Sequence, residues 1–203
     1  TEIGNSAFDG CDNLKTIYGY TGSYAETYAK EKGYTFKAIE EPVADVTTSY
    51  RTHVQSFGWQ NPVTNGVMSG TSGKAKRLEG IEISVSGNKN LGIQYSTHCQ
   101  TYGWLPWSAN GGMNGTTGEA KRLEAIKIQL TGADKDKYDV YYRVHAQSYG
   151  WVGWAKNGEE SGTAGFAKRL EGIQIVLVPK GGAAPANNYM GIQSVNTKAY
   201  IKK

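Results

Sequence analysis

The chain of 203 residues contains three histidines, and they recur at a nearly constant spacing. His53, His98 and His145 are 45 and 47 residues apart, and a period of this size indicates a repeat protein. Imidazole is a common zinc ligand, so three converging histidines could hold a zinc ion. The alternative, which we favour over a metal site, is that each histidine is hydrogen-bonded within its own sheet. The neighbouring amides would be Gln55, Gln100 and Gln147.

Tryptophan offers a second kind of chemistry. Each histidine is followed by a Gly-Trp step and then by an Asn-Gly dipeptide. An indole face can stack on a sugar ring while amide side chains fix its hydroxyl groups. The candidate ligand contacts shared by the repeats are Trp59, Trp104, Trp151, Gln55, Gln100, Gln147, Asn65, Asn110 and Asn157. The alternative is that the three tryptophans meet near a common axis and belong to the core.

Two further tryptophans are not shared by all repeats. Trp107 and Trp154 are present in the second and third repeats, whereas the first has Pro62 at that place. A residue that the common scaffold needs should be present in every copy. We therefore expect Trp107 and Trp154 to contact a ligand at the surface.

The same triplication argues against catalysis. No carboxylate pair, Ser-His-Asp set or Cys-His pair stands apart from the repeats. Each possible acid or nucleophile occurs three times, whereas an active site usually occurs once per fold. We expect a protein that is not an enzyme and has no cofactor. Repeated weak sites favour multivalent binding instead.

Each repeat predicts two strands joined by a glycine-rich loop. In the first strand, alternation places Tyr50, Thr52 and Val54 on a packed face and His53 on the other. The second strand has buried isoleucines at every other position, and the same alternation would bury its glutamate. Either a bulge at the next residue (80, 125 or 172) turns the glutamate outward, or it is buried with a partner, because a lone buried carboxylate is costly. The glutamates are Glu79, Glu124 and Glu171, and the candidate partners are Arg77, Arg122, Arg169 or loop amides.

The loops are rich in residues that accept unusual backbone angles. Asn-Gly tolerates positive φ, and the following GTSG, GTTG and GTAG indicate a tight bend with a close backbone approach. A phosphate-binding loop would need a helix directly after it, and the pattern predicts none.

We expect a mainly β fold in which the repeats close around a pseudo-threefold axis. Each repeat of about 45 residues is too small to bury a face alone, and closure removes exposed sheet edges. A β-prism fits this best, and a β-trefoil is the close alternative. An open, bead-like array is third, since 86–91 and 131–137 could link separate units.

Residues 1–41 differ in kind from the repeats. Ser23 and Glu26 form a capping box for a helix that runs to Lys32, where Gly33 supplies a left-handed stop. The stretches IGNSAF, GCDNLKTI and GSYAETYAKEKGYTF resemble the last rung and cap of a BspA-type leucine-rich repeat. The resemblance covers about 40 residues and implies a small α/β cap that sealed further rungs.

The domain boundary is expected at Glu40, Glu41 and Pro42. The second domain, 42–179, would hold the repeats at 46–85, 91–130 and 138–177. Residues 180–203 would be a connector and a C-terminal strand, which either closes a sheet or begins a further unit.

The repeat itself resembles the clostridial hydrophobic repeat with a conserved Trp (ChW repeat). The resemblance is carried by YRTHVQSFGW, NG and SGTSGKAKRLEGIEI with their two counterparts, over about two thirds of the chain. Such repeats are found in secreted and surface proteins of Gram-positive anaerobes, so the resemblance implies an exported accessory or adhesive module. Our leading hypothesis is recognition of cell-wall or host glycans. A host or cell-surface protein partner is the alternative, and an architectural spacer is third.

Composition narrows the partners further. The net charge of +4 is spread along the chain without a basic run, which argues against nucleic acid. No apolar stretch is long enough to span a membrane, and the chain starts with Thr1, so we expect a fragment of a longer protein. Cys99 replaces a valine and an alanine of the other repeats, so we expect a buried apolar role; a disulfide with Cys11 is the less favoured alternative.

Overall fold

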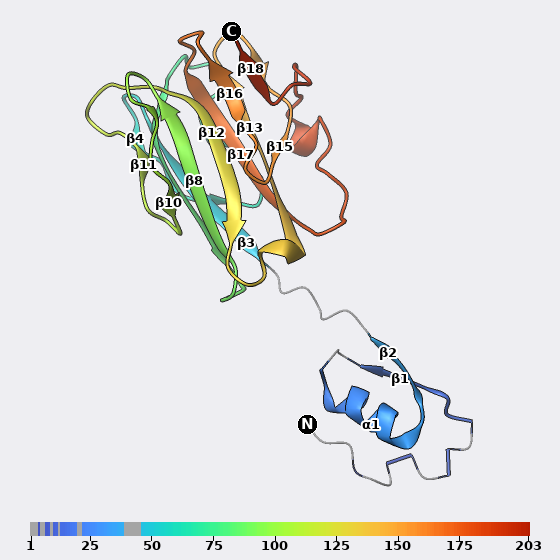
Figure 1. The fold of residues 1–203 in the computed structure, drawn as a ribbon. Helices are drawn as coiled ribbons and strands as arrows, with labels where there is room; N and C mark the ends of the chain where they lie inside the picture. Colours follow the sequence, from blue (N-terminus) through green and yellow to red (C-terminus); the bar gives the residue numbers. More distant parts are fainter. Residues whose placement is uncertain (1–3, 5–6, 9, 12, 20–21, 39–45) are drawn as a thin grey trace. The chain divides into compact units, whose positions relative to one another are not determined.

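The computed structural model describes residues 4, 7–8, 10–11, 13–19, 22–38 and 46–203. The chain divides into two compact units, Thr1–Ala44 and Asp45–Lys203, and each is described by itself (Figure 1). The boundary predicted at Glu40, Glu41 and Pro42 lies outside the described residues.

The first unit is a small α/β element. Strand β1 (Thr16–Gly19) pairs in parallel with β2 (Thr35–Ala38), and helix α1 (Tyr24–Lys32) connects them. Its buried residues are Ile17, Tyr28 and Ala29. Gly33 ends the helix in the left-handed conformation, as predicted.

The predicted capping box at the start of α1 is wrong in detail. Ser23 makes no side-chain cap hydrogen bond, and Glu26 accepts the Gly22 amide at 2.7 Å in place of the Ser23 amide. Lys30, one turn later, donates to the same carboxylate at 2.7 Å and helps to hold it there.

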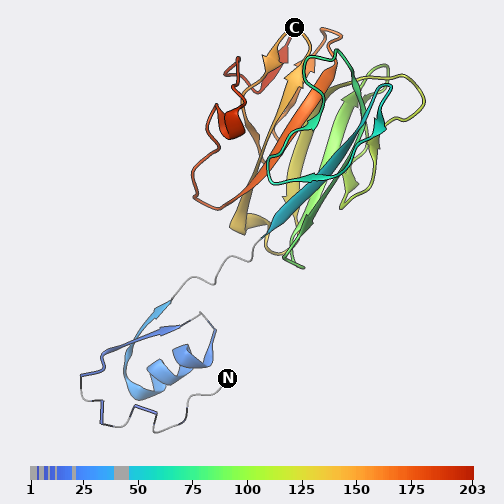
Figure 2. The ribbon, with the colours of Figure 1, turned by 180° about the vertical axis from the view of Figure 1, so that it is seen from behind.

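In the second unit, each repeat forms one long antiparallel hairpin at the centre of its own sheet (Figures 1 and 2). We number the repeats copy 1, copy 2 and copy 3 in chain order. The hairpins are β3 (Thr47–Val54) with β7 (Leu78–Ser86), β8 (Gly92–Cys99) with β12 (Leu123–Thr131), and β13 (Tyr138–Ala146) with β17 (Leu170–Pro179). Two short strands pair antiparallel with the first strand of each hairpin. They are β4 (Gly58–Trp59) and β5 (Val63–Thr64) on β3, β9 (Gly103–Trp104) and β10 (Ser108–Ala109) on β8, and β14 (Gly150–Trp151) and β15 (Ala155–Lys156) on β13.

A third short strand of each copy joins the sheet of another copy. The exchanged strands are β6 (Ser69–Gly70), which pairs with β17, β11 (Asn114–Gly115), which pairs with β7, and β16 (Ser161–Ala164), which pairs with β12. The three exchanges form a closed cycle of copies 1, 3 and 2. The open, bead-like array is therefore wrong, because each of these strands finds its hydrogen-bonding partner in another copy.

The tail after β17 packs back on the same unit. It contains a short 3-10 helix, η2 (Tyr189–Gly191), and strand β18 (Tyr200–Lys202), while another 3-10 helix, η1 (Lys135–Lys137), precedes β13. Strand β18 pairs in parallel with β16, so the tail adds a strand to an existing sheet and does not begin a further unit.

The first glycine of each GTxG loop permits the exchange. Gly70, Gly115 and Gly162 have φ between 110° and 123°, and a Cβ there would lie 2.4–2.5 Å from a glutamate carbonyl oxygen of the other copy. This confirms the predicted close backbone approach. The loop asparagines also take the predicted positive φ.

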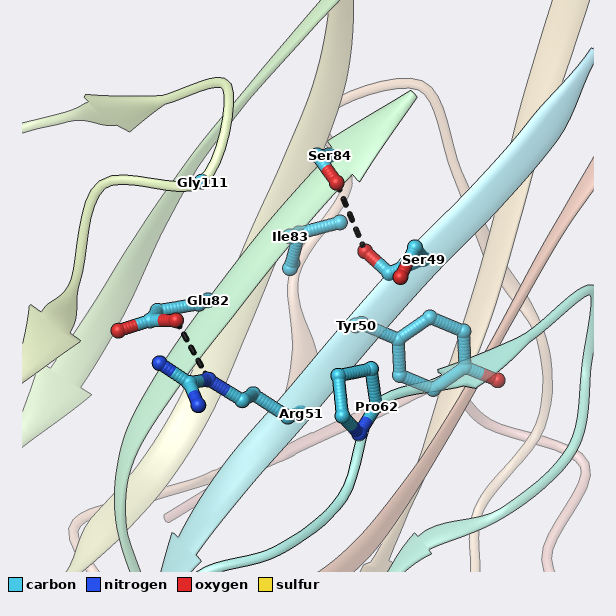
Figure 3. A pocket seen from close by; sticks show the side chains of 8 residues that line it. All are labelled: Ser49, Tyr50, Arg51, Pro62, Glu82, Ile83, Ser84 and Gly111. Atoms are coloured by element: carbon cyan, nitrogen blue, oxygen red, sulfur yellow. Dashed lines mark hydrogen bonds and ion pairs between the residues drawn. The ribbon is translucent and has the colours of Figure 1, made fainter. Parts of the chain in front are cut away.

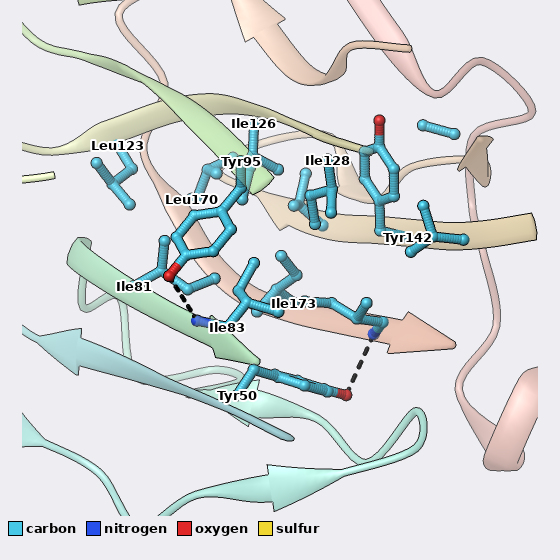
Figure 4. Close-up of a cluster of buried hydrophobic side chains, with 14 of the residues drawn as sticks. Tyr50, Ile81, Ile83, Tyr95, Leu123, Ile126, Ile128, Tyr142, Leu170 and Ile173 are labelled. Carbon is cyan, nitrogen blue, oxygen red and sulfur yellow. Dashed lines mark hydrogen bonds between the residues drawn. The ribbon is translucent and has the colours of Figure 1, made fainter. Parts of the chain in front are cut away.

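The core of the repeat unit draws residues from all three hairpins. Tyr50, Tyr95 and Tyr142 are buried, and each hydroxyl donates to a backbone carbonyl of its own copy. Each hydroxyl also accepts a backbone amide from another copy, such as Ile83 to Tyr95 at 2.9 Å (Figure 4). Burial raises the pKa of all three tyrosines, so the hydroxyls remain protonated donors.

The predicted packed face of the first strand is confirmed in each copy. Tyr50, Thr52 and Val54 are buried, and so are their counterparts, including Cys99. Cys11 and Cys99 are free thiols. The fold is mainly β, with several sheets and no closed barrel among residues 46–203, so the barrel of a β-trefoil is not found there. The β-prism stays a prediction.

Replacing Gly115 by Ala should lower the free energy of unfolding by about 3 kcal/mol or more, because the new Cβ would meet the Glu79 carbonyl inside an exchanged strand. The matched control is Gly118→Ala. Gly118 also has positive φ, but nothing lies within 4 Å of its Cβ, so only backbone strain of about 1 kcal/mol is expected. Denaturant unfolding compares the two variants, and equal losses would contradict the exchange.

Candidate functional site

Each copy carries the same cluster of Trp, His, Glu and Arg on its hairpin. In copy 1, the Trp59 and His53 rings meet edge to face with their centroids 5.5 Å apart. His53 Nδ1 lies 3.0 Å from Glu79 Oε2, and Arg77 Nε donates to Glu79 Oε1 at 2.8 Å. The counterparts are Trp104, His98, Glu124 and Arg122 in copy 2, and Trp151, His145, Glu171 and Arg169 in copy 3.

A β-bulge positions the glutamate of the cluster. His53 pairs with Gly80 and Val54 with Leu78, so Glu79 is the extra residue. It is buried, and its carboxylate oxygens meet Arg77 and His53. Of the two predicted alternatives, burial with an arginine partner is therefore correct. The bulge falls on the glutamate itself, not on the residue after it.

The histidines do not converge. Each Nδ1 lies 3.0–3.2 Å from the glutamate of its own copy, and among residues 46–203 the predicted hydrogen bond to the neighbouring glutamine is not found. Nδ1 is within ion-pair distance of the carboxylate but off the line of a directed hydrogen bond. Among the described residues there is no group of three or more His, Cys, Asp and Glu that could hold a metal ion.

A cationic side chain lies over the indole of each cluster, and a different residue supplies it in each copy. We call the indole, its cation and the neighbouring residue 62, 107 or 154 the Trp–cation face of that copy. In copy 1, Arg51 lies 4.9 Å from the Trp59 ring and Nε donates to Glu82 at 2.6 Å. In copy 2, Lys127 lies 4.6 Å from Trp104 and 5.2 Å from Trp107.

The copy 3 face is closed. Arg143 lies 5.3 Å from the Trp151 ring and 4.6 Å from the Trp154 ring, and it is fully buried. Residues of the tail cover it: Tyr189 packs edge to face on Trp154, whose indole N–H donates to Ala186 at 3.2 Å.

All five N–H groups of Arg143 are used. The acceptors are Gln174 Oε1, the carbonyls of Asn187, Tyr189 and Ile192, and Ser194 Oγ, at 2.6–3.3 Å. Burial lowers the pKa of Arg143 to about 10, so the side chain still carries its charge at neutral pH. A segment of polypeptide thus forms an acceptor cage around a cation held on two indoles.

The structure separates the predicted ligand contacts into groups. The loop asparagines have structural roles, since their side-chain oxygens accept the amides of Thr48, Ile93 and Val140. The three shared glutamines are half-buried. Trp59 and Trp104 are half-buried and Trp151 is buried, yet none belongs to the central core. Trp107 is 42% exposed, whereas Trp154 is half-buried.

Sequence reasoning did not assign the cations of the Trp–cation faces. The signal was present, because strand alternation places Arg51 and Glu82 on the same outer face as His53. These two residues are also direct cross-strand partners. Lys127 and Gln174 occupy the position of Glu82 in their copies.

A comparison with protein-family models matches the clostridial hydrophobic W (ChW) model to residues 53–87, 98–132 and 145–179, more than half of the chain. The chain therefore belongs to the ChW family, and the three predicted ChW repeats are confirmed. Each match starts at the histidine of a cluster and runs through the second strand. Neither a search of curated proteins nor a search of solved structures gives a significant match.

Glu124→Gln should lower the free energy of unfolding by about 2 kcal/mol, because it leaves Arg122 beside a neutral group in a partly buried site. Glu119→Gln is the control in the same copy: Glu119 is exposed and, within residues 46–203, accepts a hydrogen bond only from the Tyr102 hydroxyl, so a change within about 0.5 kcal/mol is expected. Thermal unfolding measures both. A Glu124 variant as stable as the control would mean that the cluster does not support the fold.

Proposed function

We propose that this chain is a non-catalytic binding module of a secreted or surface-attached protein and that it recognises glycans. The membership in a family common among surface and secreted binding proteins supports the location and the general role. No described helix has the length and apolar character needed to cross a membrane. The first unit, in this proposal, is the end cap of a BspA-type leucine-rich repeat; its parallel β-α-β arrangement is compatible with such a cap.

The glycan site that we propose is the copy 2 face. The observation that supports this site is the exposure of Trp107, which is 42% exposed and has the Lys127 ammonium group 5.2 Å from its ring. An exposed indole offers a flat apolar surface to a sugar ring, and the ammonium group can donate to hydroxyl groups. Copy 1 lacks the second indole, and in copy 3 the tail covers it.

Recognition of a protein is the second candidate. The observation that favours it is that the tail packs on the copy 3 face, where Arg143 donates hydrogen bonds to three backbone carbonyls. This candidate needs no new class of contact, because the chain already makes such contacts with itself.

In the glycan proposal, Trp107→Ala abolishes binding to an array of cell-wall and host glycans while the unfolding temperature stays unchanged, because the side chain is exposed. Tyr102→Ala is the control, since Tyr102 is also exposed and lies in the same copy. Trp154→Ala should leave sugar binding intact, because the tail contacts this indole. Equal sugar binding by the wild type and the Trp107 variant would refute the site.

A further inference from the structure

Copy 1 has an open pocket of about 240 Å³ beside its Trp–cation face, roughly the volume of eight water molecules (Figure 3). Arg51 and Glu82 form one side of it, and Pro62, Ser84 and Gly111 are among the other residues that line it. Gly111 comes from the Asn-Gly turn of copy 2, so the pocket lies where two copies meet. Nothing lies within 4 Å of the place of a Cβ at Gly111.

The equivalent place in copy 3 is filled by the tail. Its residues follow from the repeat offsets: Arg143, Gln174, Trp154, Val176 and Gly66 stand for Arg51, Glu82, Pro62, Ser84 and Gly111. A Cβ on Gly66 would lie 2.5 Å from the Tyr189 ring. The Tyr189 side chain therefore occupies in copy 3 the space that is open in copy 1.

The cation of copy 1 is held in the same way as its counterpart. Arg51 Nε donates to Glu82 at 2.6 Å, as Arg143 Nε donates to Gln174 at 2.8 Å. Both guanidinium groups lie over the indole of their own cluster, at 4.9 and 5.3 Å. In copy 3 the terminal nitrogens then bind tail carbonyls, whereas those of Arg51 have no hydrogen-bond partner among residues 46–203.

We propose that the copy 1 pocket binds a polypeptide segment of a partner protein. Backbone carbonyls of that segment accept hydrogen bonds from the terminal nitrogens of Arg51, and one aromatic side chain enters the pocket between Pro62, Ser84 and Gly111. The site differs in place and in ligand class from the proposed glycan face of copy 2, where Ser96 replaces the arginine.

Two features define the segment. Glu82 replaces Gln174 and brings a carboxylate oxygen that accepts N–H groups, so the Arg51–Glu82 pair suits the alternating acceptors and donors of a peptide backbone. The path must also end earlier than that of the tail. Gly153 allows Thr197 to approach in copy 3, since a Cβ there would lie 2.3 Å from the Thr197 carbonyl oxygen. Copy 1 has Asn61 at this position, so a partner segment has to leave the surface there.

The test uses the whole 203-residue chain and a synthetic peptide with the sequence of residues 186–196, ANNYMGIQSVN, capped at both ends. In a ¹H–¹⁵N NMR titration, the peptide should shift the signals of Gly111, Ser84 and the Trp59 indole with a dissociation constant below about 1 mM. Arg51→Ala and Arg51→Lys should each weaken binding at least tenfold, because lysine lacks the planar fork that binds two carbonyls. Replacing the tyrosine of the peptide by alanine should have a similar effect.

Lys127→Ala, the change on the copy 2 face, is the matched control and should alter peptide affinity less than twofold. The proposal is overturned if no binding occurs at millimolar peptide or if the Arg51 variants bind as well as the wild type. Shifts at Gly66 and Val176 in place of Gly111 would overturn it too, because the peptide would then displace the tail in copy 3. If a glycan shifts the Gly111 signals, the pocket binds sugars and the proposal is wrong. If Trp107→Ala abolishes glycan binding but not peptide binding, the two sites are separate, as proposed.

Discussion

The fold of the repeat unit depends on one backbone contact, made where a loop strand of one copy meets the bulged strand of another. At the copy 1 bulge, the Glu79 carbonyl accepts the Thr116 amide of copy 2 at 2.7 Å, and Gly115 lets the two backbones come this close. The glutamate side chain at the same residue is held by Arg77 and His53. The charged cluster thus fixes the bulge, and the bulge presents the carbonyl, which explains physically why every copy carries the cluster.

The copies differ in the cation on the indole and in whether the tail covers it. A shared scaffold holds an indole on each sheet, but the cation over it comes from the first strand in copies 1 and 3 and from the second strand in copy 2. The tail then covers only the copy 3 face. Three related surfaces therefore present an arginine–glutamate pair beside an open pocket, a lysine between two indoles, and a closed cage around an arginine.

Strand alternation allowed several contacts of the Trp, His, Glu and Arg clusters to be predicted from the sequence. The position of His53 on the face opposite the core follows from a period of two, and so does the alternative in which Glu79 is buried and needs a partner. The structural role of the loop asparagines could not be predicted, because a side chain that caps its own strand has the same sequence signature as one that faces solvent. Their contact with a ligand stays a prediction. The sequence predicts a connector at PKGGAAPANN and a strand after it, but nothing in it indicates that the residues between them would enclose Arg143.

The sequence by itself determined the local features: three repeats, two strands in each, the turns that require positive φ, the closely approached glycines, and the residues of the packed face. These follow from period, propensity and backbone sterics, which act over a few residues. Only the tertiary structure decided which copy receives each loop strand, which cation lies on which indole, and that one of three faces is closed by the chain itself. Those outcomes depend on tertiary contacts, such as those of Lys127 with Trp104 and of Arg143 with Asn187, and no local pattern specifies them.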